Sequence, residues 1–413
     1  MFSIVWEQVY SRMGNNTSKN KYYNNQKYTS QYSLSDLIGG SCVGTTHSTS
    51  KESKSWSRTS NKSWSEGTLY ESFGTSKTHW PVSRSQAMFL PEFEIRHVPL
   101  QSTYKLICVI AKGAYGKVYK ILKQDTGQIY ALKVINKAKV VTENGIIQAK
   151  QEVAIQKLVG HHPFILSCTH KWQGKKTLYI LTDYVGGGEL YSLIEECGSL
   201  PENVVRIYVA EIALAIDFLH NAGVVHRDIK ATNVLLDEEG HAVIIDFGLA
   251  KWLNHAERTN TLCGTPEYMA PEILKRQYYG QEVDWWSLGV LTCFMLTNQY
   301  PAGPSSELLP EDRGNDYAPA GTLPVNAEKI SAPAKDLLKR LLRPDPCLRL
   351  RSILSLQRIA FFMGYDLQSY MAKKDSPFRL LGRKVQTHQE KITKEFSSFD
   401  TSFGDSISRA DDR

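Results

Sequence analysis

The sequence predicts an α+β fold of two lobes, a small and mostly β lobe followed by a larger and mostly helical lobe. Two observations predict this. Three short segments rich in β-branched and aromatic residues, 104–110, 117–122 and 128–135, are separated by glycines, as in a meander of three strands. From about Glu189 onward, apolar residues recur at the spacing of one helix face.

The elements between these regions follow from the same patterns. A helix is predicted over about 143–158, and two further strands over 166–172 and 177–183. The clearest helix of the larger lobe is predicted to open at Ser199-Leu-Pro-Glu202, which has the form of a capping box with proline in the first turn, and to close at Gly223.

Composition excludes several classes of protein. The chain has 413 residues, a formal net charge of +7, 42% hydrophobic and 22% charged residues. It has no run of about 18 apolar residues, as a transmembrane helix needs, and Glu7 comes too early for a secretory signal. Seven cysteines without a CxxC pair argue against a disulfide framework or a structural zinc site. The cysteine usage fits a reducing compartment, so we expect a cytoplasmic protein. The charge is too scattered to indicate nucleic-acid binding.

Residues 1–90 are predicted to be a disordered, basic region rich in Ser, Thr and Asn. Ser and Thr supply 28 of these residues, and 10 Lys or Arg stand against 5 Asp or Glu. Such a segment buries too little apolar surface to offset the entropy of ordering it. Gly14 begins a match to the N-myristoylation pattern if translation starts at Met13; the alternative is a coincidental match. One acyl chain with a basic segment predicts weak membrane association at most.

Two features of the small lobe suggest phosphate binding. Ala111-Lys-Gly113-Ala-Tyr-Gly116-Lys-Val118 lies between two predicted strands, and its glycines allow backbone N–H groups to approach phosphate oxygens. An ordinary hairpin is the alternative. Lys133 stands inside an apolar strand, and Glu152 on the following helix is a candidate partner that would hold it against phosphates; a solvent-exposed strand lysine is the alternative.

The decisive segment is His226-Arg-Asp228-Ile-Lys230-Ala-Thr-Asn233, followed 18 residues after Asp228 by Asp246-Phe-Gly248. It places an acid, a lysine and an amide on one loop, with a second acid at the end of a strand. Phosphoryl transfer needs these parts: an acceptor for the hydroxyl proton, a cation for the moving group and oxygen ligands for magnesium.

The order of these motifs resembles that of eukaryotic-type protein kinases over about residues 104–361. The resemblance implies the two-lobed protein-kinase fold, with ATP and Mg²⁺ as cofactors. It also implies that Ala270-Pro-Glu272 closes an activation segment in which Glu272 pairs with Arg349. Asp284-Trp-Trp-Ser-Leu-Gly289 would start a central helix of the large lobe.

The resemblance also implies roles for individual residues. Asp228 would be the catalytic aspartate and Lys230 would face the γ-phosphate, while Asn233 and Asp246 would hold Mg²⁺. The ATP-binding residues that the resemblance implies are Ala111, Gly113, Gly116, Val118, Ala131, Lys133, Glu152, Asp183, Val185 and Leu235.

The subgroup follows from further motifs. Lys230 and Cys263-Gly-Thr-Pro-Glu-Tyr268 resemble serine/threonine rather than tyrosine kinases. Leu90-Pro-Glu-Phe93 together with Ala111-Lys-Gly113 is similar to kinases related to the ribosomal S6 kinases, and residues 362–413 resemble the C-terminal tail of the AGC group. The motifs that resemble the AGC group are His162-Pro-Phe164, Gly187-Gly-Glu-Leu190, Thr261-Leu-Cys-Gly-Thr265, Ala360-Phe-Phe362, Ser376-Pro-Phe378 and Phe399-Asp-Thr-Ser-Phe403.

Regulation and partners are also implied. Thr261 matches the activation-loop phosphosite, with Arg227 and Lys251 placed to hold a phosphate; an unmodified loop threonine is the alternative. We expect protein substrates, an upstream activating kinase, no nucleic acid and a monomer. Glu189 matches a carboxylate that selects arginine in substrates of this group, whereas Thr232 and Phe294 replace two others, so we expect weakened selection for arginine.

Three departures support a rival prediction, a weakly active or inactive scaffold with the kinase fold. Ala111 replaces a usual glycine, Gln156 replaces an apolar residue at a cost of about 1–3 kcal/mol if unpaired, and five prolines in 298–325 predict a short or displaced helix. Retention of the full set of phosphate- and metal-binding residues favours an enzyme. A dinucleotide-binding oxidoreductase is excluded because no helix follows Gly116.

Overall fold

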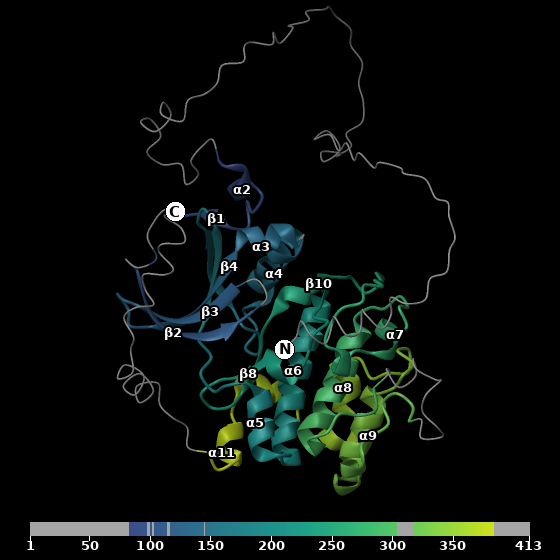
Figure 1. Ribbon diagram of the computed structural model, residues 1–413. Helices are drawn as coiled ribbons and strands as arrows, with labels where there is room; N and C mark the ends of the chain where they lie inside the picture. Colours follow the sequence, from purple (N-terminus) through teal and green to yellow (C-terminus); the bar gives the residue numbers. More distant parts are fainter. Residues whose placement is uncertain are drawn as a thin grey trace, which may run out of the picture. The chain divides into compact units, whose positions relative to one another are not determined.

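The structure is a computed structural model, which describes residues 82–96, 100, 103–113, 116–143, 145–303 and 318–383 (Figure 1). All of these residues lie in one compact unit of the chain, Leu69–Arg413. The predicted disorder of residues 1–81, the acylation match at Gly14 and the tail motif at 399–403 lie outside the described residues.

The small lobe is built on a six-stranded sheet with the order β1-β5-β6-β4-β3-β2. The predicted meander is confirmed, since β3 pairs antiparallel with both β2 and β4, and so are the two later strands. The sequence did not predict β1, which pairs parallel to β5 with Glu94 opposite Trp172. The strands are β1 (Glu94–Ile95), β2 (Tyr104–Lys112), β3 (Gly116–Lys123), β4 (Ile129–Asn136), β5 (Cys168–Gln173) and β6 (Thr177–Asp183).

The helix predicted over about 143–158 is confirmed, and a second, shorter helix that was not predicted precedes it. They are α3 (Lys137–Thr142) and α4 (Ile146–Val159). The Asn136 side chain accepts a hydrogen bond from the Ala138 N–H at 2.9 Å, which starts a helix directly after β4. Gly145 begins α4 without a side-chain cap, so the position of this helix depends on packing.

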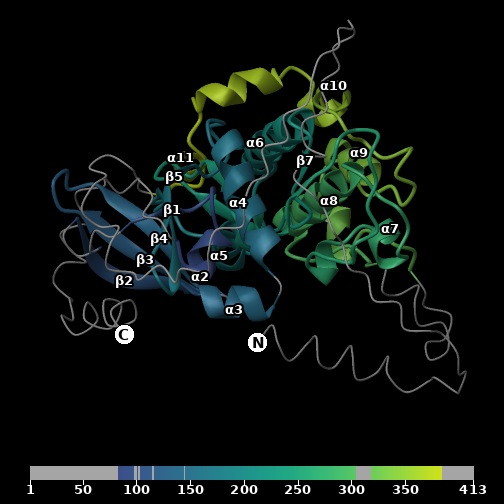
Figure 2. The same cartoon turned by 90° about the horizontal axis from the view of Figure 1, so that it is seen from above.

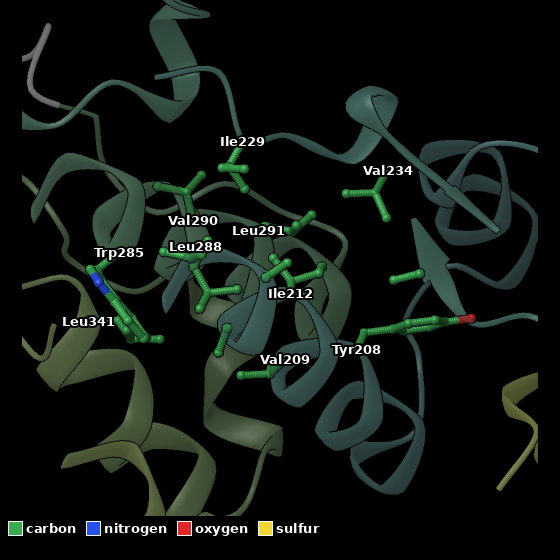
Figure 3. Close-up of a cluster of buried hydrophobic side chains, with 14 of the residues drawn as sticks. Tyr208, Val209, Ile212, Ile229, Val234, Trp285, Leu288, Val290, Leu291 and Leu341 are labelled. Carbon is green, nitrogen blue, oxygen red and sulfur yellow. The ribbon is translucent and has the colours of Figure 1, made fainter. Parts of the chain in front are cut away.

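The large lobe surrounds α6 and α8, and α8 is buried along its whole length. Figure 3 shows side chains of these two helices meeting in its core, with Trp285 beside Leu341 of α9. A Cβ at Gly289 would lie 2.8 Å from the Leu341 Cβ, so the glycine allows α8 and α9 to approach closely. The helices are α5 (Leu190–Cys197), α6 (Glu202–Asn221), α7 (Pro271–Leu274), α8 (Glu282–Thr297), α9 (Ala332–Leu341), α10 (Ile353–Gln357) and α11 (Pro377–Leu380).

Shorter elements complete the large lobe. Strand β7 (Val224–Val225) pairs with β10 (Lys251–Trp252), and β8 (Val234–Leu236) pairs with β9 (Ala242–Ile244). No helix among the described residues is long and apolar enough to cross a bilayer. The 3₁₀ helices are η3 (Ala231–Asn233), η4 (Phe247–Leu249), η5 (Pro266–Tyr268), η7 (Val325–Lys329), η8 (Ala360–Phe362) and η9 (Leu367–Ala372).

The predicted capping box at the start of α6 is wrong. The helix begins at Glu202 after Pro201, and neither makes a side-chain cap. The Glu202 carboxylate instead accepts hydrogen bonds from the N–H and the hydroxyl of Ser331, both at 2.7 Å. A tertiary contact across 129 residues has therefore replaced the local one.

The segment before the small lobe and the segment after the large lobe both pack against the folded chain. The disorder predicted to residue 90 does not extend over residues 82–90, where α2 (Arg84–Ala87) forms and the Phe89 side chain is fully buried. At the other end, the Ser376 hydroxyl donates to the Glu239 carbonyl at 2.6 Å. Phe378 packs on the same turn, where a Cβ at Gly240 would lie 2.6 Å from its ring.

The predicted pair between Glu272 and Arg349 is confirmed. Two guanidinium nitrogens donate to the two carboxylate oxygens at 2.6 and 3.0 Å, and both side chains are buried. Arg349 also donates to the Glu282 carbonyl at 3.1 Å. The pair joins α7, α8 and the segment that follows α9.

Replacing Arg349 with alanine leaves the Glu272 carboxylate buried without its partner. We expect the free energy of unfolding to fall by about 3–5 kcal/mol, measured by urea denaturation. Arg340→Ala is the matched control, because it removes the exposed Arg340–Asp336 pair and should cost about 0.2–1 kcal/mol. Equal effects of the two changes would contradict the prediction.

Candidate active site

The sheet and helix α4 bring Lys133 and Glu152 together. Lys133 lies on β4, paired with Val118 of β3, and its Nζ donates to the Glu152 Oε1 at 2.5 Å. Burial acts to lower the pKa of Lys133, but the carboxylates of Glu152 and Asp246 outweigh burial and hold that pKa above its ordinary value. The lysine therefore carries its positive charge at neutral pH.

Asp246 lies just beyond β9 in a left-handed backbone conformation, with φ of 63°. Its Oδ1 accepts the Gly248 N–H at 3.2 Å, which stabilises this turn. Burial acts to raise the pKa of Asp246, but Lys133 and the Gly248 N–H hold it below its ordinary value. The Gln148 amide of α4 donates to the Gly248 carbonyl at 2.5 Å and so joins α4 to the turn.

Asp228 is fixed by three neighbouring side chains. The Asn233 Nδ2 donates to both its backbone oxygen and its Oδ2 at 2.9 Å. The Thr265 hydroxyl donates to its Oδ1 at 2.7 Å, and the Lys230 Nζ lies 2.8 Å from its Oδ2. Lys230 also donates to the Thr265 hydroxyl at 2.8 Å. The carboxylate is thus held between the loop and the activation segment.

The loop itself is anchored by Asp284 at the start of α8. This carboxylate, which is fully buried, accepts the backbone N–H groups of His226 and Arg227 at 2.9 and 2.8 Å and bonds the His220 ring at 2.9 Å. Burial acts to raise the pKa of Asp284, but these donors hold it below its ordinary value. Arg227 has φ of 67°, a strained conformation that the anchor stabilises.

The remaining predicted nucleotide-binding residues lie on the small-lobe sheet, directly after it, or on β8. Ala111 and Val118 pair across β2 and β3, and the Gly113 N–H donates to the Gly116 carbonyl at 2.9 Å. Gly116 is required here, because a Cβ would lie 1.8 Å from the Val134 carbonyl oxygen. On neighbouring elements, Ala131 lies on β4, Asp183 ends β6, Val185 follows it, and Leu235 lies on β8.

The residues present fit a nucleotide with a divalent cation. Both bonds of the Asn233 Nδ2 go to Asp228, so its amide oxygen is the atom left for a cation, beside the ionised Asp246. The described residues hold no group of three or more His, Cys, Asp or Glu that would bind a metal alone. A carboxylate and an amide oxygen are ligands of the kind that a divalent cation takes together with phosphate oxygens and water.

One expectation about an individual residue changes in the structure, and two further residues have roles that the sequence did not predict. Gln156 is buried, but its Nε2 donates to the Leu166 carbonyl at 3.2 Å, so the predicted cost of an unpaired amide nitrogen does not arise. Sequence reasoning missed the roles of Gln148 and Thr265, although Thr265 stands in a motif already noted. The contact of Gln148 with Gly248 and that of Thr265 with Asp228 each join residues far apart in the sequence.

Thr261 lies exposed on the activation segment. Its hydroxyl lies 3.2 Å from that of Thr259, to which the Lys251 Nζ donates at 3.0 Å. The Tyr279 hydroxyl donates to the Thr261 carbonyl at 2.6 Å, and Arg227 reaches the same tyrosine at 3.4 Å. The two predicted cations therefore lie one side chain away from Thr261.

The chain is similar in sequence to known serine/threonine protein kinases and to a kinase-related protein. The Ribosomal protein S6 kinase-related protein of Homo sapiens is 34% identical over 78% of this chain and 77% of its own length. A RAC family serine/threonine-protein kinase homolog of Dictyostelium discoideum is 38% identical over 66% and 61%. Ribosomal protein S6 kinase alpha-2 of Homo sapiens is 36% identical over 67% and 38%. Residues 104–362 match the protein kinase domain, and the chain therefore belongs to the protein kinase family.

Proposed function

We propose that this serine/threonine protein kinase uses Asp228 to orient and deprotonate the substrate hydroxyl. The observation that carries the proposal is the fixed geometry of the Asp228 carboxylate, which Asn233, Thr265 and Lys230 hold from three directions. A positioned carboxylate of this kind aligns a hydroxyl for attack and accepts its proton.

The other charged residues would neutralise the charge that moves during transfer. Lys230, held at Asp228, is placed to stabilise the phosphoryl group in flight, and Lys133 would bind the α- and β-phosphates. Asn233 and Asp246 would hold Mg²⁺. MgATP, when bound, supplies the phosphoryl group that the substrate oxygen attacks as the bond to the β-phosphate oxygen breaks. The protein contributes positioning and charge rather than a covalent intermediate.

The scaffold alternative loses much of its support in this structure. Of the departures that favoured it, Gln156 finds a hydrogen-bond partner and Ala111 keeps its place in the β2–β3 pairing. Residues 304–317 of the proline-rich stretch lie outside the described residues. An enzyme that retains the full set of charged groups at the site is therefore the better proposal.

Asp228→Asn should lower kcat for phosphotransfer by about 10²–10⁴-fold, because the amide cannot accept the hydroxyl proton. The affinity for MgATP should stay within about twofold, because the phosphate-binding residues are unchanged. The assay uses purified protein and a mixed Ser/Thr peptide library. Asp336→Asn makes the same change on an exposed helix face and should have no effect. Equal activity of wild type and Asp228→Asn would exclude the proposed role, and an inactive wild type that binds MgATP would favour the scaffold.

We further propose that an upstream kinase activates the protein by phosphorylating Thr261. A phosphate on this hydroxyl would lie beside the Thr259 hydroxyl, within the reach of Lys251 and near Arg227. Such cations form charge-assisted hydrogen bonds that order an activation segment. The segment includes Thr265, so its order bears directly on Asp228.

Phosphorylation of Thr261 should raise kcat by about tenfold, the effect of one hydrogen bond to a charged group. Thr261→Ala should stay at the basal rate after treatment with a cell extract and ATP. Lys251→Met should accept the phosphate, as mass spectrometry would show, and gain less activity. A Thr261→Ala protein as active as the phosphorylated wild type would refute the switch.

Substrate selection is proposed to depend only weakly on upstream arginine. Glu189 is exposed and available to bind arginine. At another expected carboxylate position, Phe294 is buried beneath Tyr300, with ring centroids 4.6 Å apart and nearly parallel. This aromatic pair offers no charge to an arginine side chain.

Thr232, the other expected carboxylate position, is partly exposed. Thr232→Glu should therefore increase the preference for peptides with an upstream arginine by about two- to fivefold, the effect of a partly exposed ion pair. The measurement is kcat/KM for paired peptides with arginine or alanine at each upstream position. Thr232→Gln is the matched uncharged control. A wild-type requirement for two or more arginines would contradict the proposal.

Location and assembly are proposed from the sequence. We propose a cytoplasmic monomer, with weak membrane attachment through Gly14 if translation begins at Met13. The basic composition of residues 1–90 supports electrostatic attraction to anionic lipid as the second signal that one acyl chain needs.

A further inference from the structure

The segment Arg84–Ile95, here called the N-terminal strap, lies before the range that matches the kinase family. It comprises α2, a turn and β1. Figures 1 and 2 both place α2 near α3 and α4. Two aromatic side chains of the strap, Phe89 and Phe93, are fully buried, with their rings edge to face at 6.4 Å. The apolar residues buried with them are Ile135, Val140, Ala149, Val153, Leu178 and Ile180.

Polar contacts fix the register of the strap. On α4, the Lys150 Nζ donates to the Leu90 carbonyl at 2.6 Å and lies 2.8 Å from the Glu92 carboxylate. On β5, the fully buried Gln173 amide donates to the Phe93 carbonyl at 2.7 Å and to the Gln86 carbonyl at 3.1 Å. The acceptors of these hydrogen bonds are the backbone carbonyls of Gln86, Leu90 and Phe93, which are spread along the strap. They specify one position for the two aromatic rings.

The same helix carries residues of the active site on a different face. Gln148 and Glu152 of α4 reach the Gly248 carbonyl and Lys133. Ala149 and Val153, each one residue later, pack with the strap. Consecutive residues of a helix point about 100° apart, so α4 lies between the strap and the active site.

Few local interactions fix the start of α4. The helix lacks a side-chain cap at Gly145 and has no acidic residue in its first turn. Packing of its buried face therefore holds α4 in place, and Phe89 and Phe93 contribute two large side chains to this packing. A shift of α4 would move Glu152 away from Lys133, and small displacements of this kind are costly in catalysis.

We propose that Phe89 and Phe93 are positioning residues for phosphotransfer, which hold α4 where Glu152 meets Lys133 and Gln148 meets Gly248. The strap is thus an intramolecular activating segment that the chain carries itself. This inference rests on the proposed kinase activity. It assigns a function to residues that lie outside the family match, and one of them, Phe89, falls in the region that composition predicts to be disordered.

The test compares the full-length protein with the double variant Phe89→Ala/Phe93→Ala. We expect kcat/KM for MgATP to fall on the order of 10- to 100-fold, with faster hydrogen exchange of the α4 amides. A synthetic peptide of residues 82–96, added in trans, should restore both in a saturable way. The same peptide with alanine at both phenylalanine positions should restore neither.

Two further variants separate positioning from general damage. Phe89→Leu/Phe93→Leu keeps most of the apolar volume and should retain most of the activity. Ile147→Ala changes an exposed residue of α4 and should match wild type. Wild-type kcat/KM and α4 exchange in the double alanine variant would overturn the proposal. So would a loss of activity in that variant that the peptide fails to restore while α4 exchange is unchanged.

The two proposals fail in distinguishable ways. An inactive wild-type protein would refute the kinase proposal, whereas hydrogen exchange of α4 and binding of the peptide to the double alanine variant do not depend on activity. If the wild-type protein is inactive and hydrogen exchange of the α4 amides is the same in wild type and in the double alanine variant, the positioning role is refuted as well.

Discussion

A single buried carboxylate, Asp284, determines the geometry of the loop that precedes Asp228. Its two oxygens accept backbone N–H groups of consecutive residues, and one of these, Arg227, has a backbone conformation that a non-glycine residue rarely adopts. Because Asp284 is the third residue of α8, the helix that forms the core of the large lobe also orients this loop. The packing of α8 in the core therefore also fixes the position of the loop that leads to Asp228.

A second set of contacts joins the two lobes through α4. Glu152 compensates the charge of Lys133 in the sheet, while Gln148 binds the turn that holds Asp246 in the large lobe. The carboxylates of Glu152 and Asp246 raise the pKa of Lys133, and Lys133 lowers the pKa of Asp246, so that both Lys133 and Asp246 stay ionised. Correct placement of α4 is a condition for this balance of charge.

The sequence was sufficient where short motifs carry chemistry. It predicted the strands and the contact of Lys133 with Glu152, and the resemblance added the pair of Glu272 with Arg349. It failed where a distant partner overrides a local pattern, since Glu202 binds Ser331 instead of capping its own helix. It also failed at the start of the strap, because the composition of residues 1–90 conceals the one phenylalanine, Phe89, that is buried in the small lobe. In both cases the structure depends on residues that are distant in the sequence and close in space, which the local residue pattern does not show.

The contact of Phe378 with the turn at Gly240 shows that the folded body is longer than the stretch of sequence that defines the family. Gly240 has a positive φ and no room for a side chain, because the phenylalanine ring lies where its Cβ would be. A side chain at position 240 would have to displace the ring, and the positive φ would strain that side chain even after the ring was lost. The two positions, 138 residues apart, therefore constrain each other unequally: the ring can be lost without a change at Gly240, but no side chain fits at position 240 while the ring is there.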